Sequence, residues 1–320
     1  MAIPEPLRRG LRLPLIGAPL FIVSNPDLVI AQCTSGIIGA VPSLNARPAD
    51  ELGRWLETIT TAIAAHDAAH PEAPAAPFAI NLIVHKSNPR LMEDLAICAR
   101  FRVPLIITSL GANEEVNEAV HGWGGLVFHD VINQRFARKA IEKGADGLIL
   151  VAAGAGGHAG VQSPFALVAE TRAWFDGPVA LSGAISTGAG ILAAQAMGAD
   201  FAYMGSPFIA TREANSTAAY KEAIINGSAQ DIVNSSYFTG VNGNYLRESI
   251  VAQGMDPENL PQRDPSAMDF GEASGAKAWK DIWGAGQGIG SIHETVPTAT
   301  FIRCLAREYA AAKAHLTDLG

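Results

Sequence analysis

Eight short apolar runs, separated by segments of helical character, constrain the fold of this chain more than any other feature. Each run is continuously apolar and rich in β-branched residues, which is typical of strands covered on both faces, as in a parallel sheet. The runs span residues 13–20, 35–42, 77–84, 103–110, 124–131, 145–152, 178–185 and 199–206. The helical segments between them span residues 50–65, 89–101, 113–120, 133–143, 163–174 and 187–197.

This alternation favours a (β/α)8 barrel of the α/β class. Gly144 and Gly198 stand where helices meet strands, and glycine ends a helix readily in the left-handed conformation. A doubly wound open sheet is also compatible with alternating strands and helices, but the count of eight units favours the barrel. In a barrel the active site lies at the carboxyl ends of the strands.

The chain continues well beyond the eighth run. After residue 206, 114 residues remain (320 minus 206), whereas one more helix would close a barrel. Helical patterns at 218–225 and 245–252 predict a small helical insert or lid, and 298–314 reads as an amphipathic helix returning to the barrel. We therefore expect a barrel at 1–212, an insert at 213–275 and a returning segment at 276–320.

Composition narrows the partners. The formal net charge is −8 and no run of Lys or Arg occurs, so nucleic acid and an anionic membrane surface are disfavoured. Cys33, Cys98 and Cys304 are far apart and fit neither a disulfide framework nor a zinc site, and no other spacing suggests a metal. With no apolar run of membrane-spanning length, we expect a soluble cytoplasmic protein.

The sixth run leads into a glycine-rich turn that ends in a histidine. Gly154, Gly156 and Gly157 precede His158, and glycine allows the backbone to approach a ligand closely. A histidine near its ordinary pKa exchanges protons at neutral pH, which suits a catalytic base. The alternative is a tight loop with a solvated histidine.

The seventh and eighth strand-to-helix turns predict a phosphate site. Ser182, Gly183 and Ala184 form one turn, and Gly205 and Ser206 begin the other. Free N–H groups at helix starts bind phosphate, and barrels commonly place that site after strands seven and eight. No Walker or Rossmann glycine motif occurs, so the phosphate belongs to a mononucleotide such as flavin mononucleotide (FMN) or to a sugar phosphate. Glycine serving only tight turns is the other interpretation.

Further polar residues follow the third and fifth runs. Asn81 carries an amide that both donates and accepts, which suits a mixed polar ligand edge, although asparagine is also common in turns. His129 and Asp130 end the fifth run. A histidine there is more often a support residue than a base, and Asp130 is placed to orient it.

The motifs together resemble the nitronate monooxygenase family over nearly the whole chain. They are residues 78–82, the Gly-Gly-His-Ala-Gly turn at 156–160, residues 182–185, residues 198–206 with 210–213, and the Trp-Gly-Ala-Gly-Gln-Gly segment at 283–288. The resemblance implies FMN in a barrel, with His158 as the catalytic base beside the flavin. Two positions depart from the family pattern: Ala18, Pro19 and Leu20 stand where glutamine and glycines are frequent, and Asp130 stands where a lysine is frequent.

From this resemblance we expect an FMN-dependent oxidoreductase that oxidises nitronates or nitroalkanes with O2. Three alternatives remain: an NAD(P)H-dependent FMN reductase of quinones or enoyl thioesters, a flavin-free barrel lyase or isomerase for a sugar phosphate, and a non-catalytic flavin-binding protein. The expected partners are a small-molecule substrate and either O2 or NAD(P)H. The sequence leaves open whether the protein forms a homo-oligomer. The expected cofactor-binding residues are Ala18, Pro19, Leu20, Asn81, Asp130, Gly156, Gly157, Ser182, Gly183, Ala184, Gly205, Ser206 and Gln287.

Overall fold

The computed structural model describes residues 3–262 and 279–318, and its main feature is a closed barrel of parallel strands. The sheet order is β1-β9-β8-β6-β5-β4-β3-β2, and a parallel bridge between Ile16 and Ile38 joins the two ends. The (β/α)8 prediction is confirmed and the open sheet is not formed. The barrel strands are β1 (Leu15–Gly17), β2 (Gly39–Pro42), β3 (Phe78–Ile83), β4 (Leu105–Ser109), β5 (Leu126–Val131), β6 (Gly147–Val151), β8 (Val179–Ser182) and β9 (Phe201–Met204).

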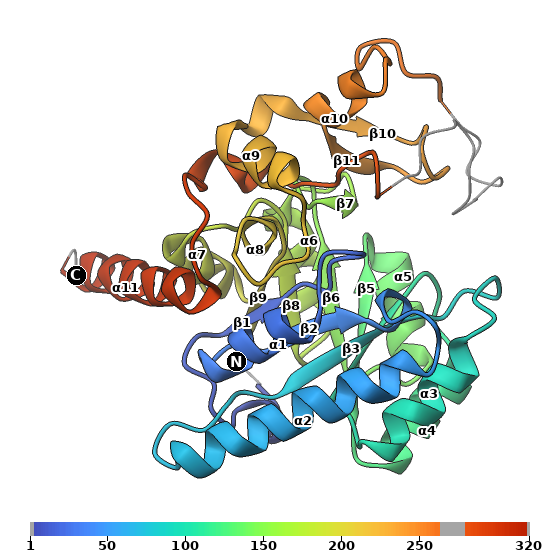
Figure 1. Cartoon of the computed structure of the whole chain (residues 1–320), viewed down its shortest axis with the longest axis vertical. Helices are drawn as coiled ribbons and strands as arrows, with labels where there is room; N and C mark the ends of the chain where they lie inside the picture. Colours follow the sequence, from blue (N-terminus) through green and yellow to red (C-terminus); the bar gives the residue numbers. More distant parts are fainter. Residues whose placement is uncertain (1–2, 263–278, 319–320) are drawn as a thin grey trace.

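Helices surround the barrel (Figure 1). Asn113, Asn133 and Thr187 each accept a backbone N–H at the start of a helix, so short polar side chains fix where these helices begin. Gly198 ends α7 with a φ of +111°, as expected of a left-handed terminus. The helices are α1 (Pro26–Thr34), α2 (Glu51–Ala69), α3 (Leu91–Arg100), α4 (Glu114–Gly122), α5 (Gln134–Glu142), α6 (Pro164–Arg172), α7 (Gly188–Met197) and the short α8 (Ser206–Ile209).

The core has two parts because successive residues of a strand point to opposite faces. One set of side chains fills the barrel interior and includes Ala79, Ile107, Phe128, Ile149 and Phe201. The other lies between the strands and the helices. The same alternation places the last inward-facing residue of each strand at the barrel mouth.

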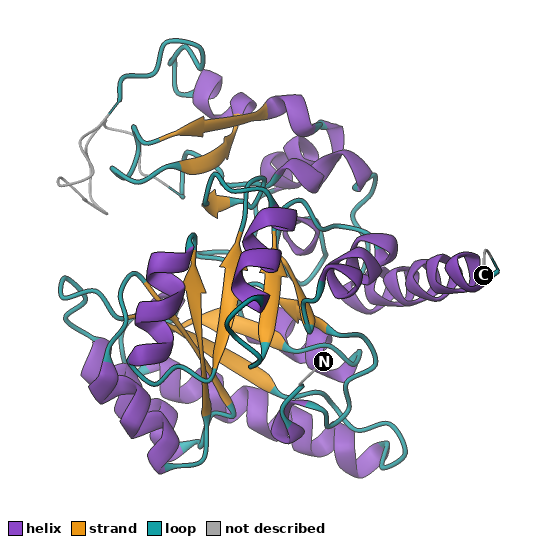
Figure 2. Cartoon of the chain, turned by 180° about the vertical axis from the view of Figure 1, so that it is seen from behind, coloured by secondary structure: helices purple, strands orange, loops and turns teal. Residues whose placement is uncertain are grey.

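The segment after β9 forms a cap above the carboxyl ends of the strands (Figures 1 and 2). It contains α9 (Ala218–Asn226), β10 (Ile232–Ser235), β11 (Gly243–Leu246) and α10 (Arg247–Ala252). β10, β11 and the two-residue β7 (Gly157–His158) form an antiparallel sheet. The helix expected at 218–225 is present, but the pattern at 245–252 begins as a strand, because Tyr245 and Leu246 pair with β10.

The cap is therefore mixed, with strands as well as helices, and it joins the barrel through β7. Residues 263–278 lie outside the described residues. The boundaries 213–275 and 276–320 consequently stay predictions.

The last helix, α11 (Thr298–Thr317), packs along α7. The Gly188 N–H donates to Glu308 Oε2 at 2.7 Å, and Tyr309 hydrogen-bonds Gln195. α11 buries Thr298, Ile302 and Leu305 and exposes much of its remaining surface. Within residues 3–262 and 279–318, no helix is both long and apolar enough to cross a membrane.

Candidate active site

A cavity of about 900 Å³ lies between the barrel mouth and the cap. Ligand sites for drug-sized molecules are typically about 300–1,000 Å³, so this one accommodates a large ligand. Gln287 is not among the lining residues, and its main-chain N–H donates to Gly154 O at 2.9 Å. All the other expected site residues line it, namely Ala18, Pro19, Leu20, Asn81, Asp130, Gly156, Gly157, His158, Ser182, Gly183, Ala184, Gly205 and Ser206.

The floor of the cavity carries a chain of hydrogen bonds across three strands. Asn81 Nδ2 donates to Ser109 Oγ at 2.7 Å, and Ser109 Oγ donates to Asp130 Oδ2 at 2.5 Å. Asp130 Oδ1 has no hydrogen-bond partner among the described residues. Burial raises the pKa of Asp130 to about 6, although the Ser109 bond opposes the shift. The floor thus holds a carboxyl group that is partly protonated near neutral pH.

Tyr203 completes this layer from β9. Its side chain belongs to the barrel interior, and its pKa lies well above the ordinary tyrosine value because of burial and the nearby Asp130 charge. The sequence interpretation missed both Ser109 and Tyr203. Each is the last inward-facing residue of an apolar run, so the two-residue alternation contained the signal.

His129 lies on the other face of the same strand. Its Nδ1 contacts Thr108 Oγ1 at 2.6 Å, and burial lowers its pKa to about 4. Because neighbouring strand residues point to opposite faces, Asp130 does not orient His129, contrary to the sequence interpretation. His129 is among the residues that line the cavity, but its ring is bonded to Thr108, and we interpret it as a support residue.

His158 lies in the roof, within β7. Its Nε2 is 2.8 Å from Thr239 Oγ1. Its ring packs edge to face against the Trp279 ring, with 5.3 Å between the two ring centres. Thr239 Oγ1 also donates to Val241 O at 3.1 Å. Burial lowers the pKa of His158 to about 4, so the imidazole is neutral at pH 7. Thr239 and Trp279 were not expected from the sequence.

The roof is held to the barrel by close backbone contacts at two glycines. A Cβ on Gly156 would lie 2.8 Å from Gly286 N, and a Cβ on Gly286 would lie 2.6 Å from Gly154 O. Only glycine fits at these contacts. Gly286 N–H donates to Ser206 Oγ at 2.8 Å, so the 283–288 segment is tied to the sixth and the eighth turns together.

The seventh and eighth turns form a cradle of backbone donors. Gly183 has a φ of +139°, and a Cβ there would lie 2.8 Å from Ala153 O, so the turn requires glycine. The N–H groups of Gly183, Gly205 and Ser206 form no hydrogen bond within the described residues. Ala184 N–H donates to Gly154 O at 3.2 Å and is therefore not a free donor. Three main-chain donors and the Ser206 hydroxyl remain for an anion.

The fold and the position of this cavity define a (β/α)8-barrel enzyme, because sites of this fold form at the carboxyl ends of the strands. A family model described as nitronate monooxygenase matches residues 10–308, and the chain belongs to this family. The chain is thus a flavin-dependent oxidoreductase, as the motifs led us to expect.

Individual relatives agree with this assignment. A nitronate monooxygenase of Paraburkholderia phytofirmans is 27% identical, with 93% of each chain covered. The nitroalkane oxidase structure from Streptomyces ansochromogenes has a TM-score of 0.79 at 23% identity and covers 98% of this chain and 100% of that one. The FabK structure from Thermotoga maritima has a TM-score of 0.77 at 22% identity, covering 99% and 98%. The two structures support the barrel fold.

Proposed function

We propose that the cavity binds FMN, with its phosphate in the cradle of Gly183, Gly205 and Ser206. The observation that carries this proposal is the set of unused main-chain N–H groups at two adjacent turns, beside the start of α7. Such groups bind a phosphate dianion well, because each N–H is a fixed donor and the helix dipole favours negative charge. The Ser206 hydroxyl accepts from Gly286 and keeps its own proton to donate.

The floor suits the polar edge of a flavin ring. Asn81 Nδ2 donates to Ile107 O and Ser109 Oγ, which leaves its Oδ1 as an acceptor. Asp130 Oδ1, which lacks a partner among the described residues, adds either an acceptor or, when protonated, a donor. Bound FMN supplies the acceptor for two electrons from the substrate.

His158 is the proposed base of the roof. Being neutral at pH 7, it can take the acidic proton next to a nitro group. A conjugate acid with a pKa of about 4 makes it a weak base, so nitronates, which have already lost that proton, are the better substrates. For them no proton has to be removed, and Thr239 fixes the orientation of the His158 ring.

We therefore propose a nitronate monooxygenase that oxidises alkyl nitronates, and less readily nitroalkanes, with O2. The second candidate is an NAD(P)H-dependent reductase of quinones or enoyl thioesters. Its support is the extent of the cavity, which runs from the cradle to Phe21 and Arg47 and leaves room for a nicotinamide beside a mononucleotide.

Anaerobic stopped-flow reduction separates the two candidates. We expect the visible flavin absorbance to bleach on mixing with ethyl nitronate and to return on addition of O2. Rapid bleaching by NADH or NADPH with no response to a nitronate would favour the reductase. A purified protein that is colourless and takes up no FMN would overturn both.

A cytosolic location is also part of the proposal. It is supported by Cys33, Cys98 and Cys304, which are all free thiols. Homo-oligomerisation stays a prediction, and size-exclusion chromatography with light scattering tests it directly.

A further inference from the structure

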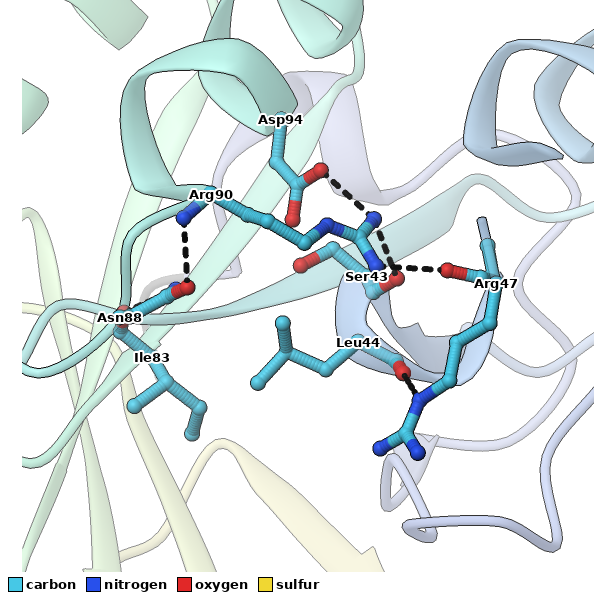
Figure 3. A network of polar contacts seen from close by, with 8 residues as sticks. Ser43, Leu44, Arg47, Ile83, Asn88, Arg90 and Asp94 are labelled. Atoms are coloured by element: carbon cyan, nitrogen blue, oxygen red, sulfur yellow. Dashed lines mark hydrogen bonds and ion pairs between the residues drawn. The ribbon is translucent and has the colours of Figure 1, made fainter. Parts of the chain in front are cut away.

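The outer rim of the cavity, formed by the loops after β1, β2 and β3, carries an arginine whose charge the rest of the site does not use. This outer rim consists of Phe21, Leu44, Arg47, Ser87 and Asn88, which all line the cavity. Arg47 Nε donates to Leu44 O at 3.0 Å (Figure 3). Its guanidinium lies 5.4 Å from the centre of the Phe21 ring. Within residues 3–262 and 279–318, its two Nη groups form no hydrogen bond and no ion pair.

Arg90 fixes the loop that carries Arg47. Arg90 Nη1 donates to Ala46 O at 2.7 Å, and Nη2 forms an ion pair with the fully buried Asp94 at 2.9 Å (Figure 3). The charge of Arg90 is therefore neutralised by Asp94. Arg90 acts on the loop, and Arg47 is left to act on the cavity.

Asn45 fixes the same loop from the other side. Its Nδ2 donates to Leu20 O at 2.9 Å and Ser24 O at 2.8 Å, and its Oδ1 accepts from Ile22 N at 2.8 Å. The backbone before Arg47 is thus tied to the loops after β1 and β3. A guanidinium presented from a fixed loop and already anchored through Nε loses less entropy on binding a ligand.

The charges around the cavity favour an anion at this place. The whole chain carries a net charge of −8, which repels anions at long range. Yet among the described residues that line the cavity, Asp130 on the floor is the only one with a carboxyl group. At the mouth, Arg47 and Lys139 have no ion-pair partner in the described part of the chain, and Lys139 lies on α5, three strands around the barrel from β2. A local cation is what an acidic protein needs to retain an anionic substrate.

We propose that Arg47 is a specificity-determining residue that binds an anionic group, a carboxylate or a phosphate, carried by the substrate at the end remote from its reacting atom. The two free Nη groups match two oxygens of such a group in a bidentate arrangement, which a lysine does not reproduce. The inference rests on the proposed function, since it names the class of substrate for that site.

Two matched pairs of substrates test the proposal on the FMN-loaded enzyme. The nitronate of 3-nitropropanoate differs from that of 1-nitropropane by a carboxylate, and NADPH differs from NADH by a phosphate. In Arg47→Gln we expect KM for the more charged member of one pair to rise about tenfold. This is the lower end of the range for a hydrogen bond to a charged group, because Arg47 is exposed to solvent. The kcat values and KM for the other member should change less than twofold, and Arg47→Lys should be intermediate. The pair that responds identifies the source of the anion.

Arg303→Gln is the matched control, because Arg303 is an exposed arginine on α11 outside the cavity. Unchanged KM values for every member of both pairs, or equal shifts of the two nitronates, would overturn the proposal, whereas equal shifts of NADH and NADPH would place Arg47 on the diphosphate that both carry. Titration of each variant with NADPH and with 3-nitropropanoate, followed by flavin absorbance, requires no turnover. Arg47-dependent binding without turnover would contradict the proposed function alone, whereas turnover that ignores Arg47 would contradict this inference alone.

Discussion

The floor and the roof of the cavity are held by hydrogen bonds between residues that lie at very different separations along the sequence. On the floor, Ser109 bonds Asp130 across 21 residues and Asn81 bonds Ser109 across 28. In the roof, His158 meets Thr239 across 81 residues, and Asn244 Nδ2 donates to Ala155 O across 89. The floor is a property of neighbouring barrel strands, whereas the roof exists only where distant parts of the chain meet.

Two histidines show what this difference means for chemistry. His129 and His158 both have a pKa of about 4, and in both cases burial is the cause. Both residues line the cavity, but the His129 ring is hydrogen-bonded to Thr108 on the neighbouring strand β4, whereas the His158 ring lies in the roof and contacts Thr239. A lowered pKa marks burial in both, so the pKa by itself does not distinguish a base from a support residue.

The largest effect is expected at the cradle, from Gly205→Asp. Two like charges 4 Å apart repel by about 4 kcal/mol at an effective dielectric constant of 20, so FMN affinity should fall by up to about a thousandfold. Flavin content after purification and an FMN titration measure the loss. Gly53→Asp on α2, where an added Cβ meets nothing within 4 Å, is the control. Unchanged flavin content would place the phosphate elsewhere.

Replacing His158 by Ala tests the role of the roof while leaving the floor and the cradle intact. Without this general base, turnover of a nitroalkane should fall roughly 10²–10³-fold. Turnover of the corresponding preformed nitronate should fall less than tenfold, because its proton has already been removed. Flavin content should stay unchanged. His121→Gln, at a histidine on α4 outside the cavity lining, is the control and should leave both rates within twofold. Equal losses on nitroalkane and nitronate would contradict the assignment of His158 as base.

His129 should instead affect stability in acid. A histidine whose pKa is lower in the folded protein stabilises it fully above the unfolded pKa of about 6.5, and this contribution is lost as the pH falls towards 4. Between pH 7 and pH 4.5, wild type should therefore lose roughly 2 kcal/mol more unfolding free energy than a variant without His129. Urea unfolding at both pH values measures it, and the comparison with wild type cancels the opposite effect of Asp130. Parallel pH profiles would show that His129 is not buried as described.

The smallest effect is expected from Thr239→Val. The change keeps the shape of the side chain and removes the hydroxyl next to His158 Nε2, so kcat/KM for a nitroalkane should fall roughly fivefold, about one hydrogen bond. The acidic limb of the pH profile should shift as well, which a purely structural role would not produce. Thr239→Ser keeps the hydroxyl and should restore both. Failure of the serine to do so would show that the methyl packing of Thr239 matters more than its hydrogen bond.

The range of the contacts also explains what could be predicted from the sequence. Asn81, Asp130, Gly183 and Gly205 stand where apolar runs end, and parallel strands bring those ends together. His158 was found because the glycine-rich turn around it is local. Local sequence patterns could therefore predict the main residues of the floor and of the cradle.

Thr239 and Trp279 have no such local signal. Each reaches His158 only because β11 pairs with β7, and β10 and β11 are too short to stand out from the helical pattern around them. Gly156 was expected to allow close approach of the backbone to a ligand, whereas the structure also requires it for contact with Gly286. Pairing across more than eighty residues left no periodicity to detect.

The pairing of β7 with β11 has a consequence for biosynthesis. While a ribosome has delivered only the first two hundred or so amino acids, the nascent polypeptide already possesses every barrel strand but lacks Thr239 and the edge partner of His158. The cylinder is thus encoded first, and the imidazole acquires its working environment only when the final third of the message has been translated.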